Sequence, residues 1–317
     1  MTTEKVSLGM DIGGTGMRAA LVDQGGQFRS DFVDVERDAD TLVHIAKVTQ
    51  QLRDEASKSG LAIERVGIGL AGIVDPTTEI LISSPTMVSM EGLNFRKEIQ
   101  EITGIMTVIN NDANSAGYAE WMFGAGKGSQ NCVSLFIGTG IGGAIVLDGR
   151  LFVGKYGVAG EIGHMILDPN GPECPCGARG CLEQLASGTA IERYVTTKLS
   201  EGHPSLLLQS FLEGKKISGK EIAEAAKKGD QLAVEAYEEA AKWLGIGIST
   251  LSNLLNMEVA VVGGGVMAVS QLLMPTILDM VDKYTMKVQK KTLTVKRNEL
   301  GREAGTIGAA LLALSQK

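Results

Sequence analysis

The stretch LGMDIGGTGMRAALVDQGGQF, residues 8–28, predicts two strands joined by a turn made almost entirely of glycine. Leu8 and Met10 continue an apolar alternation that begins at Val6, as in a strand with one buried face. GGTG interrupts the alternation, MRAALVD resumes it, and a third strand is expected after a Gly-Gly turn. The fold therefore begins with a β-hairpin.

A second stretch, CVSLFIGTGIGGAIVLDGRLF, residues 132–152, repeats these elements in the same order and over the same length. Chance resemblance between two Gly-rich hairpins is the alternative, and one matching pair does not exclude it. The repeat predicts two similar α/β domains. Further strands are expected at residues 65–75, 106–112 and 258–266, a helix from about Ala113, and an apolar helix over residues 303–317.

Length and composition set the class of protein. A chain of 317 residues is long for one core, and 44% hydrophobic with 21% charged residues is typical of a globular protein. The net charge of −7 disfavours a general nucleic-acid or anionic-membrane surface. The first strand starts close to Met1, which leaves no room for a signal peptide, and the longest uncharged run, residues 131–147, is short and Gly-rich. We expect a cytoplasmic protein.

Glycine clusters follow three of the expected strands, at Gly13-Gly14, residues 138–143 and residues 263–265. Backbone N–H groups approach phosphate oxygens closely only where no side chain intervenes, and Thr15 and Thr139 add hydroxyl donors. The clusters match neither the phosphate-loop pattern nor the dinucleotide fingerprint. Any one of them could be a tight turn, but three together favour a nucleotide.

Asp11 and Asp112 are the carboxylates that suit phosphoryl transfer. Asp11 precedes the first glycine turn and could hold Mg²⁺ through water, or could cap the turn. Asp112 lies in INNDANSA, where a strand meets a helix. Transfer of a phosphoryl group to an alcohol needs a carboxylate that orients the hydroxyl and accepts its proton. Asp112 could serve, with Asn111 bonding a neighbouring hydroxyl, but on spacing alone a helix cap is narrowly the better explanation.

The segment GHMILDPNGPECPCGARGCLE, residues 163–183, contains one histidine and three cysteines, and predicts a zinc site formed by His164, Cys174, Cys176 and Cys181. A disulfide would leave one thiol unpaired, and a redox pair would normally read C-x-x-C. Four protein ligands leave no open coordination position, so the zinc is expected to be structural.

Glu161 lies three residues before His164, and Glu183 two after Cys181. A metal that fixes this loop would fix both carboxylates, which with the imidazole could hold the vicinal hydroxyls of a sugar. The alternative is a pair of solvent-exposed glutamates.

With these motifs in place, the chain resembles the ROK family (repressor, open reading frame, kinase) of sugar kinases, and within it the bacterial glucokinases. The resemblance covers nearly the whole length, and its most specific part is the cysteine segment. The motifs that carry it are DIGGTGMR, GIGLAGIVD, NNDAN, IGTGIGGA, AGEIGHM, CPCGARGCLEQLASGTA, VVGGGV and EAGTIGAA. The family implies an actin-like, ribonuclease H-like, two-domain sugar kinase fold with a nucleotide and sugar cleft between its lobes.

The resemblance also implies the role of each site residue. Asp112 is the general base, and the sugar contacts are Gly72, Asn111, Asp112, Glu161, His164 and Glu183. The ATP contacts are Asp11, Gly13, Gly14, Thr15, Gly138, Thr139, Gly140, Gly264 and Gly265. The expected domains are residues 1–115 joined by the helix at about 304–317, and residues 116–303 with the zinc loop at 163–183.

The implied activity is ATP-dependent phosphorylation of the 6-hydroxyl of glucose, with Mg²⁺ and a structural zinc. The alternatives are a kinase for fructose, mannose, N-acetylmannosamine or N-acetylglucosamine, or a non-catalytic sugar-binding regulator. Repressors of the family carry an N-terminal helix-turn-helix domain, for which a first strand at Val6 leaves no space. By analogy with the family we expect a dimer or tetramer, and neither a nucleic-acid nor a membrane partner.

Overall fold

The computed structural model describes residues 4–13, 16–36, 41–75, 77–84 and 87–315. The chain forms two compact units, each assembled from separate segments. Unit 1 comprises Met1–Gln130, Ala144–Gly160 and Glu299–Lys317, and unit 2 comprises Asn131–Gly143 and Glu161–Asn298. These units are defined by contacts within the chain, and the domain boundaries expected from the sequence stay a prediction.

Unit 1 is built on a five-stranded sheet of order β3-β2-β1-β4-β7. The first three strands are antiparallel neighbours, whereas β1, β4 and β7 run parallel. The strands are β1 (Glu4–Ile12), β2 (Gly16–Val22), β3 (Val33–Glu36), β4 (Leu61–Leu70) and β7 (Thr107–Asn111), with a small hairpin of β5 (Ile73–Val74) and β6 (Leu81–Ser83). The expected hairpin over residues 8–28 is confirmed, because β1 and β2 pair from Ile12–Met17 outward.

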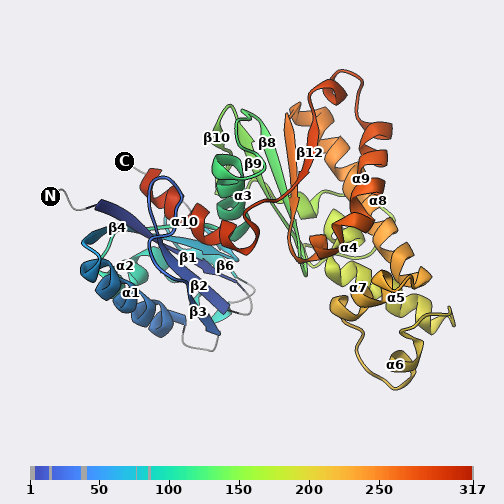
Figure 1. Ribbon diagram of the computed structural model, residues 1–317, viewed down its shortest axis with the longest axis horizontal. Coiled ribbons are helices and arrows are strands. Elements are labelled where there is room, and N and C mark those ends of the chain that lie inside the picture. Colours follow the sequence, from blue (N-terminus) through green and yellow to red (C-terminus); the bar gives the residue numbers. More distant parts are fainter. Residues whose placement is uncertain (1–3, 14–15, 37–40, 76, 85–86, 316–317) are drawn as a thin grey trace. The chain divides into compact units, whose positions relative to one another are not determined.

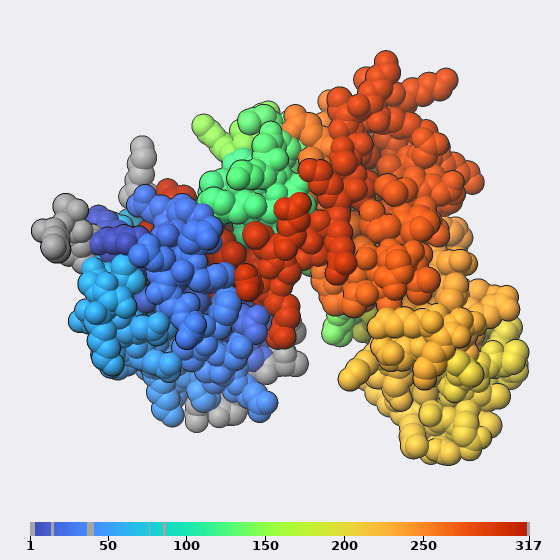
Figure 2. All heavy atoms as spheres, viewed as in Figure 1, coloured from blue at the N-terminus to red at the C-terminus, as the bar shows by residue number. Residues whose placement is uncertain are grey.

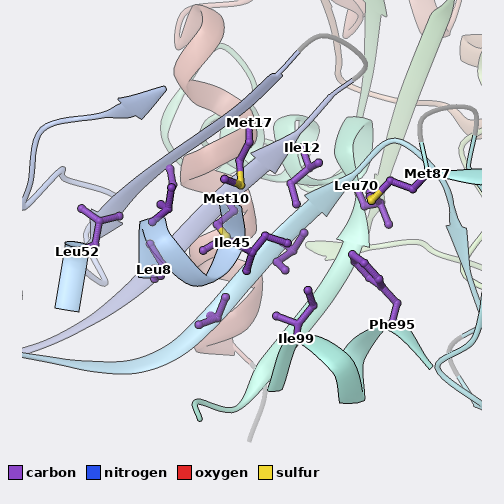
Figure 3. Packing of buried hydrophobic residues seen from close by; sticks show 14 of the residues in the cluster. Leu8, Met10, Ile12, Met17, Ile45, Leu52, Leu70, Met87, Phe95 and Ile99 are labelled. Carbon is purple, nitrogen blue, oxygen red and sulfur yellow. The ribbon is translucent and has the colours of Figure 1, made fainter. Parts of the chain in front are cut away.

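One face of this sheet packs against α1 (Thr41–Lys58) and α2 (Phe95–Thr103). Leu8 and Met10 of β1 are fully buried there with Ile45 of α1 and Phe95 of α2, as Figure 3 shows. Alternate residues of a strand point to opposite faces. The apolar alternation that predicted β1 therefore also places Leu8 and Met10 in this core.

The opposite face is covered by α3 (Asp112–Phe123) and α10 (Ala304–Ser315). The approach is close: a Cβ at Gly67 of β4 would lie 1.9 Å from the carbonyl oxygen of Ala309. Only glycine permits this contact between helix and strand. In Figure 1 the red helix α10 lies along β1, and Figure 2 shows the red C-terminal residues against the blue N-terminal ones.

The second sheet has the order β10-β9-β8-β11-β12, which reproduces the first sheet strand for strand. It is formed by β8 (Cys132–Ile137), β9 (Ile141–Leu147), β10 (Arg150–Leu151), β11 (Val259–Gly263) and β12 (Thr294–Arg297). Strands β8, β11 and β12 are parallel, and β9 and β10 are antiparallel. The matching order confirms the predicted repeat of the hairpin in the second half of the chain.

The helices of unit 2 are α4 (Leu182–Ala186), α5 (Gly188–Ser200), α6 (Leu208–Leu212), α7 (Gly219–Lys227), α8 (Gln231–Leu255) and α9 (Ser270–Tyr284). A break at Gly229 separates α7 from α8, whose N-terminus is capped by Asp230. Residues 265–284 would be long and apolar enough to cross a membrane by length and composition alone. One face of α9 is instead buried, through Leu273, Ile277 and Val281, and α9 packs along α8.

Candidate active site

In unit 1 the candidate residues lie at the carboxyl ends of the parallel strands β1, β4 and β7. Asp11 lies in the last part of β1 and Gly13 follows that strand, Gly72 follows β4, Asn111 ends β7, and Asp112 comes directly after it. Ligands of open α/β sheets bind at this end of parallel strands. The topology therefore gathers residues as far apart in sequence as Asp11 and Asp112 at one edge of one sheet.

Asp112 is the first residue of α3. Its Oδ1 accepts the backbone N–H of Ala113 at 2.8 Å, and Asn111 caps the same helix by accepting the N–H of Asn114 at 3.0 Å. The cap role that the sequence allowed for Asp112 thus belongs to Asn111. Burial raises the pKa of Asp112, which makes its carboxylate a stronger base than an exposed aspartate.

Asp11 lies close to Asp112 and to Gly305, where α10 begins. Burial and the Asp112 charge raise the pKa of Asp11 to about 6, against the opposing effect of Arg18. The carboxylates of Asp11 and Asp112 repel each other when both are ionised. A cation bound here would offset that repulsion and would be stabilised by both carboxylates. Gly14 and Thr15, which were expected beside Asp11 as phosphate contacts, lie outside the described residues.

Arg18 is a charged neighbour of Asp11 that the sequence pattern did not single out. It stands opposite Asp11 across the β1–β2 pair, and its guanidinium binds Asp34 with an Nε–Oδ1 distance of 2.7 Å. Counting the register of the hairpin outward from the glycine turn would have placed Arg18 opposite Asp11.

In unit 2 the two expected phosphate turns lie together at the carboxyl ends of β8 and β11. The N–H of Gly138 donates to Gly140 at 2.8 Å, and the carbonyl of Gly138 accepts the N–H of Gly188. Gly264 adjoins this turn, since a Cβ there would lie 2.4 Å from the oxygen of Ile137. Thr139 accepts a bond from the hydroxyl of Thr189. The cluster predicted from separate sequence motifs is therefore one surface, shared by Gly138, Thr139, Gly140, Gly264 and Gly265.

The four predicted zinc ligands come together. One donor atom from each of His164, Cys174, Cys176 and Cys181 lies within 4.8 Å of the others. The Nδ1 of His164 is 3.6 Å from the Cys174 sulfur, and the sulfurs of Cys176 and Cys181 are 3.6 Å apart. Burial and the neighbouring thiols raise the pKa of Cys181 to about 12. Three neighbouring thiolates repel one another, and a divalent cation offsets that repulsion. Three sulfurs and one imidazole nitrogen therefore fit a tetrahedral zinc ion.

Backbone hydrogen bonds fold the cysteine loop tightly. Gly180 accepts the N–H of Leu167 at 2.9 Å and donates to Pro172 at 2.8 Å. Its φ is +67°, and a Cβ there would lie 1.5 Å from the oxygen of Asp168. The glycine is thus required both by conformation and by space.

Glu161 and Glu183 flank this loop. Glu161 precedes the 3₁₀ turn η2 (Ile162–His164), and its carbonyl accepts the N–H of His164 at 3.0 Å. Glu183 lies in the first turn of α4, where its Oε2 accepts the N–H of Ile141 at 2.9 Å beside Gly140. The Glu183 side chain therefore joins the helix that follows the cysteines to the end of the glycine turn.

The chain resembles known proteins over nearly its full length. The model of the ROK family matches residues 7–316. The glucokinase of Thermotoga maritima is 32% identical over 96% of this chain and 95% of that protein. A crystal structure of a ROK family glucokinase from Streptomyces griseus in complex with glucose and AMPPNP has 34% identity and a TM-score of 0.81, covering 98% of this chain and all of that one. The DNA-binding transcriptional dual regulator NagC of Escherichia coli is 31% identical over 87% of this chain, which spans 67% of that protein.

Proposed function

Because the chain belongs to the ROK family, we propose that it is a glucokinase, which transfers the terminal phosphoryl group of ATP to the 6-hydroxyl of glucose. The observation that carries the proposal is the similarity to glucokinases along nearly the whole chain. Kinases for another hexose, and sugar-binding regulators, occur among related proteins and are the alternatives.

Asp112 is the proposed general base. Its carboxylate orients the 6-hydroxyl and accepts its proton as the sugar oxygen bonds to the γ-phosphorus and the bond from phosphorus to the ADP oxygen breaks. Its raised pKa supports this role, because a base with a pKa nearer to neutrality accepts the proton more readily. Asn111 uses Oδ1 as the helix cap, so its amide N–H groups are the part that donates to a sugar hydroxyl.

The remaining sugar contacts are proposed from both units. In unit 1 we assign backbone near Gly72, and in unit 2 Glu161, His164 and Glu183. The Nδ1 of His164 faces the sulfurs, which leaves Nε2 as the atom that meets the sugar. One imidazole would then couple the metal-bound loop to the substrate.

The phosphates of ATP are assigned to glycine turns. These are Gly13, Gly14 and Thr15 in unit 1, and Gly138, Thr139, Gly140, Gly264 and Gly265 in unit 2. Their N–H groups stabilise the charge on the transferring group. When bound with ATP, Mg²⁺ neutralises phosphate charge, and Asp11 is the carboxylate that would hold it through water. The zinc, when bound, supplies a fixed geometry for the cysteine loop and no chemistry of the reaction.

We also propose a soluble cytoplasmic homo-oligomer, and domains of residues 1–115 with 304–317 and of residues 116–303. The decisive experiment measures sugar phosphate formation with glucose, fructose, mannose, N-acetylmannosamine and N-acetylglucosamine, each with ATP, where ADP release also reports it, and with polyphosphate as donor. Glucose with ATP is expected to give the highest kcat/KM. Another sugar in first place would replace glucose as the substrate, and no sugar phosphate from any sugar would favour the regulator.

A further inference from the structure

The two residues Ala71 and Gly72 connect β4 to β5 in unit 1, and the backbone near Gly72 is one of the proposed sugar contacts. Gly72 lines a pocket of about 230 Å³ together with Asn111, another proposed contact of the sugar. A backbone group binds a ligand well only when its peptide is already held in the orientation that binding needs. Whatever holds this short connection therefore affects how tightly the sugar binds.

Ser84 lies opposite this connection, just beyond the small hairpin. Strands β5 and β6 are antiparallel with Ile73 paired to Ser83, and the same register brings the next residue, Ser84, beside Gly72. The two backbones approach closely: a Cβ at Gly72 would lie 2.8 Å from the carbonyl oxygen of Ser83 and 3.0 Å from the Cβ of Ser84. Glycine at position 72 thus keeps Ser84 within reach of Ala71.

The hydroxyl of Ser84 bonds directly to the connection. Its Oγ donates to the carbonyl oxygen of Ala71 at 2.7 Å and accepts the N–H of Met87 at 3.1 Å. The backbone N–H of Ser84 donates to Oε1 of Glu91 at 2.9 Å, which holds Ser84 itself in place. Ser84 is only 1% exposed, so removal of its hydroxyl would leave the Ala71 carbonyl without this partner at a site that water does not reach easily.

The carbonyl that Ser84 binds belongs to the same peptide group as the N–H of Gly72. This peptide is planar and trans, so its C=O and its N–H point in opposite directions. A bond that fixes the carbonyl of Ala71 therefore also fixes the direction of the Gly72 N–H. The N–H of Ala71 belongs to the preceding peptide and donates to the carbonyl oxygen of Ile12 at 3.2 Å, which anchors that end to β1 independently of Ser84.

We propose that Ser84 is a positioning residue for sugar binding, whose hydroxyl holds the Ala71–Gly72 peptide so that the N–H of Gly72 faces a sugar hydroxyl. The inference rests on the proposed function, which supplies the sugar as the ligand of Gly72. Ser84 acts through the backbone and not on the reacting atoms. Its loss should therefore weaken ground-state and transition-state binding equally, which raises KM for glucose and leaves kcat nearly unchanged.

Ser84→Ala tests the proposal, and Ser83→Ala is the matched control, because it makes the same change at the neighbouring, exposed residue. In Ser84→Ala we expect KM for glucose, and the dissociation constant of glucose measured by calorimetry, to rise about three- to tenfold, as for one lost neutral hydrogen bond. The bond from Ala71 to Ile12 remains, so kcat and KM for ATP should stay within about twofold of the wild type.

A purely structural role would lower the melting temperature of Ser84→Ala and leave its glucose constants equal to those of Ser83→Ala. That result, or an equal rise in KM for ATP, would overturn the proposal. If Ser84→Ala does not fold, Glu91→Ala repeats the test, because Glu91 is exposed and its loss removes the acceptor of the Ser84 N–H. Unchanged glucose constants in that variant would overturn the proposal as well.

The calorimetric constant separates this proposal from the proposed function, because it requires no turnover. Glucose binding without formation of any sugar phosphate would contradict the kinase. The comparison of Ser84→Ala with Ser83→Ala would still decide the role of Ser84.

Discussion

The carboxylate of Glu120, in the middle of α3, accepts the backbone N–H of Leu300 at 2.8 Å, which joins residues 180 positions apart. The same side chain also accepts the N–H groups of Ala125 at 3.0 Å and Glu299 at 3.1 Å. Ala125 lies just before the chain leaves unit 1, and Glu299 is where it returns. One fully buried carboxylate thus holds the segments at the first and the last of the four crossings against the helix that begins with Asp112.

We therefore expect Glu120→Ala to be among the most destabilising single substitutions in α3. It leaves the buried N–H of Ala125 without an acceptor, at about 1–3 kcal/mol, and the partly buried N–H groups of Glu299 and Leu300 at less, so the free energy of unfolding should fall by about 2 kcal/mol or more. Urea unfolding measures this, with Glu238→Ala, an exposed glutamate of α8, as the control. Equal effects of the two substitutions would show that Glu120 does not hold the crossings.

Asp112→Asn should keep glucose binding and lose at least ~10²-fold in kcat, since an amide cannot accept the proton of the hydroxyl. Calorimetry measures the binding and ADP release measures kcat. Turnover close to that of the wild type would remove Asp112 from the proposed mechanism.

The pH dependence of stability tests the environment of Asp11. Its pKa is raised from 3.8 to about 6, so the folded chain binds a proton more tightly than the unfolded chain does. The folded state is therefore favoured below pH 3.8, and this contribution is lost as the pH rises from about 4 to 6. Asp11→Asn removes the cost of ionising a buried carboxylate. The substitution should therefore stabilise the Mg²⁺-free chain at pH 7 by up to about 3 kcal/mol, but not at pH 4. Urea unfolding at both pH values decides this, and a gain that does not depend on pH would contradict it.

Cys176→Ala should release zinc and weaken glucose binding, because the loop that carries His164 and leads into Glu183 loses one of four ligands. Cys132→Ala is the control: that thiol is buried in β8 and is not among the four ligands. Elemental analysis of both variants gives the zinc content. A wild-type protein that contains no zinc would refute the assignment.

Two glycines of the cysteine loop form a matched pair. Gly177 and Gly180 both have positive φ, +93° and +67°, but a Cβ at Gly177 meets nothing within 4 Å, whereas at Gly180 it would lie 1.5 Å from Asp168 O. Gly177→Ala should cost about 1 kcal/mol through backbone strain and keep the zinc. Gly180→Ala should lose the zinc as well. Similar melting temperatures and zinc contents would show that the contact with Asp168 is not restrictive.

The sequence predicted the parts of the fold that depend on local pattern. Alternation at Leu8 and Met10, the glycine turns and the ligand spacing of the cysteines are all short-range signals, and each led to the right element or cluster. Strand β12 was missed, because its residues TVKR are mostly exposed and it is held in place by parallel pairing with β11.

Buried polar groups were the harder part of the site. Nothing in its neighbours along the chain marks Glu120 as fully buried, since its partners lie 179 and 180 residues away. Asn114 is another example, because its place beside the Asp112 motif does not indicate that its side chain is buried.

The position of α10 has a consequence for biosynthesis. This helix covers the face of the first sheet beside β1 and β4, yet it is encoded after all of unit 2. The strands of the first sheet leave the ribosome before α10 does. Gly67 and its neighbours therefore stay uncovered until the second unit has been translated. Nascent chains arrested before Ala304 should accordingly recruit chaperones through that open sheet, and release them once the helix emerges from the exit tunnel.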